Sequence, residues 1–325
     1  MIKFFRQSYA IQYVAIAALA VALWIPAFAS GKAVMGLESP VTPLFNFVAH
    51  LLGQSSAAQH VLAFVLLIVN ALFFNAILVN NQIIGKVETM GAFVFVLLTS
   101  LTRTQTNFYP FLLSLVFILL SINLLYGVYL SQSPEFDLLK TGMCVALASL
   151  CYFQSILLII WVMVSLPVAK KSSLRLELIP LTGLFSVYFF YFVGTYLFGD
   201  FLPMVHGYRG WFLQLKLSVS GFNLKIVILL FVLLSVAILL LFGNSNLEKT
   251  LAVRVKISMS VILLAFSVPM LFFGDSVLLN GLIFIALSIV ISYEFSSIVN
   301  TGWANLLLSL FLLLVFANHY FLKLL

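Results

Sequence analysis

The stretch that most constrains the fold is residues 141–169, TGMCVALASLCYFQSILLIIWVMVSLPVA, which carries no charged side chain and lies between Lys140 and Lys170. One helix needs about 20 apolar residues to cross the hydrocarbon core of a bilayer, and two crossings need about 40. The stretch is therefore too long for one crossing and too short for two. We expect it to enter the membrane and return as a short-armed helical hairpin, with its turn near CYFQS.

The rest of the chain is also dominated by apolar segments. They cover approximately 9–29, 60–79, 90–102, 110–130, 177–198, 224–243, 257–273, 276–295 and 303–322. Only 8% of the residues are charged, against about 25% in soluble domains. Helices satisfy their own backbone in lipid, and the alternating pattern of a barrel is absent. We predict an all-α polytopic membrane protein with about 10–11 transmembrane helices, forming a single integral membrane domain over residues 1–325.

Lysine and arginine in short loops predict the orientation, because they are enriched on the cytoplasmic side. With a hairpin at 141–169 and a cytoplasmic N-terminus, ten of these residues lie inside and six outside. A single crossing would reverse the bias of the second half of the chain. We therefore expect a bacterial inner (cytoplasmic) membrane protein whose net charge of +7 reflects topology. We expect no binding of nucleic acid.

Two predicted external loops, 30–59 and 199–223, are long enough to carry interfacial helices. In the first loop, Leu44–Leu52 is amphipathic, as expected of a helix lying in the membrane interface. In the second loop, Tyr208 and Trp211 are typical of the aromatic belt at the headgroups.

The candidate site residues are few. Glu38 is a candidate general base, and a solvated loop acid is the alternative. Arg209 and Arg103 are candidate phosphate ligands through their planar guanidinium groups, and an interfacial arginine that binds headgroups is the alternative for each. Asp200 and His206 lie in the same loop as Arg209 and complete the candidate substrate-binding set.

Polar residues within the apolar segments predict packing rather than chemistry. Asn70, Asn75 and Asn123 are interpreted as hydrogen-bonding between helices. Cys144 and Cys151 are interpreted as small packing residues. The histidines are scattered and no nucleotide-binding or metal-binding spacing is present, so we expect no metal and no cofactor.

The region from 135 to 190 resembles a bacterial family of multi-pass inner-membrane proteins. The shared features are the small-residue run KTGMCVALASL, the aromatic CYF, a second apolar arm followed by Arg175, and a helix that opens with Pro180 and Gly183. WIPAF at 24–28 and the C-terminal WANLLLSLFLLLVFANHYFL are also similar, so the likeness spans most of the chain. This family brings no established activity.

More distantly, the layout is similar to that of C-class (GT-C) glycosyltransferases, which use lipid-phosphate sugar donors. Their first helix is followed by a long external loop with an interfacial helix and a catalytic acid, and short helix pairs build a lipid cavity. The resemblance implies that Glu38 is the base and that Arg209 or Arg103 holds the donor phosphate. The first loop departs from the pattern because it offers one Glu and no acidic pair.

These observations predict a protein of envelope biogenesis that handles a polyprenyl-linked or other lipid-linked substrate, with membrane lipids and a lipid-linked glycan precursor as its partners. If it is an enzyme, it is a GT-C-like glycosyltransferase. The alternative is a non-enzymatic role, as a membrane subunit of an envelope complex or as a lipid or solute carrier.

Overall fold

The computed structural model describes most of the chain. The residues it leaves undescribed are 1, 8–9, 31–41, 53–55, 101–107, 172, 200–201, 203–204, 210–249, 271–279, 298–300 and 318–325. Within the described ranges the regular structure is helical and no strand occurs. Four helices are long and apolar enough to cross a membrane: Ala57–Asn80, Pro110–Val128, Leu174–Phe198 and Leu251–Pro269. The all-α class and the membrane-spanning character predicted above agree with this finding.

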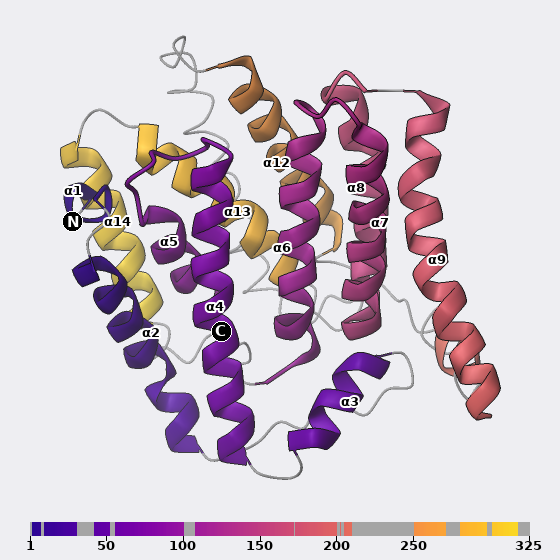
Figure 1. The fold of residues 1–325 in the computed structure, drawn as a ribbon. Helices are drawn as coiled ribbons and strands as arrows, with labels where there is room; N and C mark the ends of the chain where they lie inside the picture. The colour runs from indigo at the N-terminus through magenta and orange to yellow at the C-terminus, as the bar shows by residue number, and fades with distance from the viewer. Residues whose placement is uncertain are drawn as a thin grey trace. The chain divides into compact units, whose positions relative to one another are not determined.

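The helices belong to two compact units, each of which is described by itself. Unit 1 contains Met1–Ala33, Ser56–Asn107 and Ser218–Leu325, and unit 2 contains Val34–Ser55 and Phe108–Leu217. Figure 1 shows the helices of both units.

Unit 1 is built around a short buried helix. Its elements are α1 (Ile2–Phe5), α2 (Ala10–Ser30), α4 (Ser56–Asn80), α5 (Met90–Thr99), α12 (Leu251–Met270), α13 (Asn280–Ser297) and α14 (Thr301–Ala317). Every residue of α5 is buried, and α5 packs against α4 and α13. Ten residues rise only about 15 Å, which is half of a hydrocarbon core of about 30 Å. The predicted segment 90–102 is therefore a core helix too short to cross a membrane on its own.

Asn75 fixes the start of this core helix. Its side-chain amide donates to the carbonyl oxygen of Glu88 (3.0 Å), and its side-chain oxygen accepts from the backbone amide of Ala92 (3.2 Å). The first backbone amides of a helix lack intrahelical partners. Asn75 of α4 supplies the acceptor for one of these amides in α5, that of Ala92. The interpretation of Asn75 as a hydrogen bond between helices is confirmed.

Four chain segments of unit 1 meet at one end of its helices: the N-terminus, the loop after α4, the start of α12 and the end of α13. The hydrogen bonds that join segments at this end run from the Thr89 amide to the Phe5 carbonyl (2.9 Å), from Lys256 Nζ to the Asn81 carbonyl (3.2 Å) and from Arg6 Nη2 to the Phe295 carbonyl (2.7 Å). The hairpin prediction requires the N-terminus, 80–89 and the start of α12 to share one side. With a single crossing at 141–169, the start of α12 would lie on the other side.

Unit 2 contains a helical hairpin at the position where one was expected. Its elements are α3 (Pro43–Leu52), α6 (Pro110–Val128), α7 (Pro134–Cys151), the 3-10 helix η2 (Phe153–Leu157), α8 (Leu158–Val168) and α9 (Leu174–Phe198). In Figure 1, α7 and α8 form adjacent antiparallel helices joined at their lower ends. Nη2 of Arg175 lies 4.0 Å from Oε1 of Glu135, so the beginnings of α9 and α7 are at the same end. The chain between them has therefore returned to the end at which α7 began.

The two arms of the hairpin differ more in length than we expected from the sequence. We expected about 14 residues in each arm, whereas α7 has 18 and α8 has 11. The first arm is longer because α7 begins at Pro134, where proline suits the first turn, rather than after Lys140. At 1.5 Å per residue the arms rise about 27 Å and about 17 Å, so only α8 falls far short of the membrane thickness.

Candidate functional site

The structure describes only part of the predicted site. Glu38, Arg103 and Asp200 lie outside the described residues. His206 and Arg209 lie in one helical turn at 205–209, and both side chains are exposed. This turn follows α9 by a few residues. The described part of the site therefore holds His206 and Arg209 but neither of the candidate acids.

Tyr208 anchors that turn to the helices of unit 2. Its ring lies 4.8 Å from the ring of Phe153, measured between centroids. It also packs against the buried cluster that Ala146, Leu150, Phe153 and Tyr188 form. Tyr208, which we expected in the headgroup belt, is half-buried against the protein. The anchor holds the neighbouring His206 and Arg209 beside the hairpin tip.

Burial also determines the chemistry of Tyr208. Removal from water disfavours the phenolate, so burial raises the pKa of Tyr208 well above its ordinary value. The hydroxyl therefore stays protonated at neutral pH. It cannot serve as a general base, and its oxygen is buried from solvent.

The hairpin tip is closed by backbone bonds and aromatic packing. The amide of Tyr152 donates to the carbonyl of Ala148 (2.8 Å), and the amide of Ser155 donates to the carbonyl of Tyr152 (2.9 Å). We expected the Gln154 and Ser155 side chains to satisfy the backbone at this turn. Instead, Gln154 Oε1 accepts from the hydroxyl of Tyr152, and Ser155 Oγ has no partner among the described residues.

A helix, α3, is present where the amphipathic piece Leu44–Leu52 was predicted. Phe45 is buried and its ring stacks on Phe108 at 5.0 Å. Phe47 and Leu51 are exposed, so α3 also carries apolar side chains on its exposed face. Leu44 packs against the same cluster as Tyr208, which brings α3 and the 205–209 turn to one region of unit 2.

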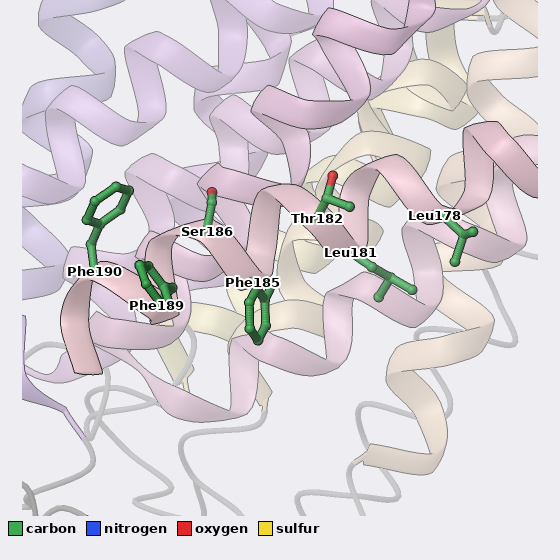
Figure 2. Close-up of a pocket in the computed structure, with 7 residues that line it drawn as sticks. All are labelled: Leu178, Leu181, Thr182, Phe185, Ser186, Phe189 and Phe190. Atoms are coloured by element: carbon green, nitrogen blue, oxygen red, sulfur yellow. The ribbon is translucent and has the colours of Figure 1, made fainter. Parts of the chain in front are cut away.

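The outer face of α9 forms an apolar pocket that the sequence did not single out (Figure 2). The pocket measures about 590 Å³ and is lined by Leu178, Leu181, Thr182, Phe185, Ser186, Phe189 and Phe190. Pro180, Gly183 and Tyr188 are the buried residues of α9, and they lie on the opposite helical face. The helix therefore packs on the protein with one side and presents an open, aromatic surface with the other.

Sequence reasoning also missed buried charges in unit 1. Lys256 of α12 is 6% exposed and Glu294 of α13 is 5% exposed. The amine of Lys256 is satisfied by the carbonyl of Asn81, whereas Oε1 of Glu294 has no hydrogen-bond partner in the described structure. Glu294 was overlooked because it lies near the end of an apolar segment, where a charge normally reaches water.

A second pocket lies in unit 1. It measures about 510 Å³ and is lined by Tyr13, Leu72, Asn75, Ala76, Val79, Asn80, Lys86 and Glu88. Unlike the pocket on α9, it combines apolar residues of a candidate spanning helix with charges of both signs.

Comparisons with known proteins give no relative from which a function could be transferred. No family model, no curated protein and no solved structure matches the chain. The class that the fold defines is that of an all-α protein with several helices capable of crossing a membrane.

Proposed function

We propose that this protein is a multi-pass inner-membrane protein of envelope biogenesis that handles a polyprenyl-linked or other lipid-linked substrate in unit 2. The observation that carries the proposal is the apolar pocket on the outer face of α9, a helix long enough to span a bilayer. Substrate chains of this class are hydrocarbons, and a pocket lined by leucine and phenylalanine stabilises a hydrocarbon by contact and shape.

The polar end of such a substrate would be bound at the turn that follows α9. Arg209 has a planar guanidinium that can hold a phosphate through two parallel hydrogen bonds. The side chain is exposed and its turn is anchored by Tyr208. His206 lies on the same turn and adds a second donor.

If the protein is a glycosyltransferase of the GT-C type, Glu38 is the general base and Arg103 and Asp200 complete the site. The alternative function is a lipid carrier or a non-enzymatic subunit of an envelope complex. The open pocket favours the carrier as the second candidate, because binding the lipid chain requires none of these three residues.

Binding is tested with the protein reconstituted in nanodiscs and a photoactivatable polyprenyl phosphate. We expect Arg209→Ala to weaken labelling about tenfold, the loss of one good charge-assisted contact. The matched control is Arg175→Ala, which removes an exposed arginine at the other end of α9 and should leave labelling unchanged. Equal labelling of wild type and both variants would refute phosphate binding at Arg209.

Catalysis is tested separately. Glu38→Gln should retain wild-type labelling and abolish transfer of sugar from the lipid-linked donor. Loss of transfer with intact labelling supports the enzyme. Transfer that survives the substitution contradicts the role of Glu38, whereas labelling without any transfer by the wild type favours the carrier.

A further inference from the structure

The pocket in unit 1 has the form of a receptor for one phospholipid molecule. Its polar rim consists of Asn80, Lys86 and Glu88, at the end of α4 and in the loop that follows. Its apolar wall consists of Leu72, Ala76 and Val79, from the last turns of the same helix. Because α4 is a candidate spanning helix, this pocket lies where hydrocarbon gives way to headgroups.

The apolar wall continues along α4. An apolar stripe of exposed residues recurs at helical spacing along this helix and comprises Val61, Val65, Val69, Leu72 and Ala76. From Val61 to Ala76 the stripe rises about 22 Å, which is comparable to one leaflet of the hydrocarbon core plus its interface. An acyl chain can therefore follow α4 away from the pocket without leaving an apolar surface.

The rim has an unsatisfied acceptor. Oε2 of Glu88 is buried and has no hydrogen-bond partner among the described residues. Although Lys86 stands two residues away, the two side chains do not form an ion pair within 4.0 Å. A buried carboxylate oxygen without a donor is costly, so a ligand that brings an N–H group to Glu88 would be stabilised here.

The rim also has a cation for the other half of the ligand. Lys86 is exposed at the pocket, and its ammonium can bind a phosphate as a point charge. The hydroxyl of Tyr13 and the side chain of Asn80 supply neutral hydrogen-bonding groups at the same pocket. A ligand that fits both charges carries a phosphate and a primary ammonium a few bonds apart.

We propose that this pocket binds a phospholipid with a phosphoethanolamine headgroup. The ammonium donates to Glu88, the phosphate lies at Lys86, and an acyl chain follows Leu72 and Ala76 along α4. This inference is independent of the function proposed for unit 2.

The test uses the full-length protein purified from nanodiscs that contain equal amounts of phosphatidylethanolamine, phosphatidylcholine and phosphatidylglycerol. Native mass spectrometry measures which lipids remain bound. We expect wild type to retain phosphatidylethanolamine about tenfold over phosphatidylcholine, whose quaternary ammonium has no N–H to donate. Retention of the three lipids in proportion to their supply would overturn the proposal.

Substitutions at the rim identify the site. Glu88→Gln should abolish the preference for phosphatidylethanolamine over phosphatidylcholine, and Glu88→Lys should shift retention toward phosphatidylglycerol. Lys86→Ala should lower retention of all three lipids. The matched controls, Asp137→Asn and Lys140→Ala in unit 2, make similar charge changes away from the pocket and should retain the wild-type pattern. A Glu88→Gln variant that keeps the preference would refute the site.

A last comparison separates the lipid from a soluble ligand of the same chemistry. Free phosphoethanolamine added in large excess should leave the lipid pattern unchanged, because it lacks the chains that contact α4. Displacement of phosphatidylethanolamine by the free headgroup at equal potency would show that the pocket serves a soluble molecule, which contradicts the proposal.

Discussion

Gly142 of α7 lies directly against Pro180 of α9. A Cβ atom placed on Gly142 would overlap the carbonyl oxygen of Pro180, and one placed on Gly183 would overlap the carbonyl oxygen of Leu139. The two helices thus approach through backbone atoms, as small residues permit in membrane helix pairs. The contact joins the first arm of the hairpin to the helix that carries the apolar pocket.

We expect Gly142→Ala and Gly183→Ala to destabilise the protein, each by about 1–3 kcal/mol, because the helices must separate to admit the methyl group. Thermal unfolding in detergent measures the effect. Gly194→Ala is the matched control on α9, since nothing lies within 4 Å of its added Cβ, and helix propensity makes it neutral or stabilising. Equal melting temperatures for all three variants would refute the close packing.

A buried hydrogen bond reinforces the same pair of helices. Ser149 Oγ and the Tyr188 hydroxyl are 2.8 Å apart. Ser149 donates its single proton to the carbonyl of Ala146 (2.6 Å), so Tyr188 is the donor to Ser149. A double-mutant cycle of Ser149→Ala and Tyr188→Phe should give a coupling energy of about 1 kcal/mol. A coupling of zero would contradict the bond.

Asn75 should be the asparagine of α4 on which the stability of unit 1 depends most. Asn75→Ala removes two hydrogen bonds and leaves the Ala92 amide without its partner. The expected loss is about 2–3 kcal/mol, measured by chemical or thermal unfolding. Asn80→Ala, at the exposed end of the same helix, is the control and should change stability by less than about 0.5 kcal/mol. The reverse order would contradict the assignment of the main structural role to Asn75.

Much of the fold was predictable because hydrophobic length decides where helices lie. The predicted segments 9–29, 60–79, 110–130 and 177–198 correspond to α2, α4, α6 and α9 within a few residues at each end. The hairpin was predictable from length and charge together. The start of α7 was missed because Pro134 and the acidic residues after it resemble a loop, although both features also suit the first turn of a helix.

The sites were far less predictable. The pocket on α9 depends on which face of an almost uniformly apolar helix packs inward, and hydrophobicity alone does not distinguish the two faces. The glycines at positions 142 and 183 were a usable signal for which face of the helix packs inward. The rim at Glu88 was not recognisable either, because one acid in a short loop gives no sign that its carboxylate will be buried.

The account also predicts proximity across the loops that flank the hairpin. Glu135→Cys combined with Arg175→Cys, in a background with Cys144 and Cys151 replaced by alanine, should be joined efficiently by a short bis-maleimide, because the native side chains meet at 4.0 Å. The control pair is Glu135→Cys with His206→Cys. These two residues lie near opposite ends of α9, so the reagent should not cross-link them. Equal cross-linking of the two pairs would argue against the hairpin.

The most direct test of the central claim is the side of the membrane on which each end of α9 lies. A single cysteine at Lys171 or at His206, in the cysteine-free background, is exposed to a membrane-impermeant maleimide in intact cells and again after lysis. The account predicts that the cysteine at 206 is labelled in intact cells and that the cysteine at 171 is labelled only after lysis. Labelling of the cysteine at 171 in intact cells would contradict the re-entrant hairpin and, with it, the external placement of Arg209.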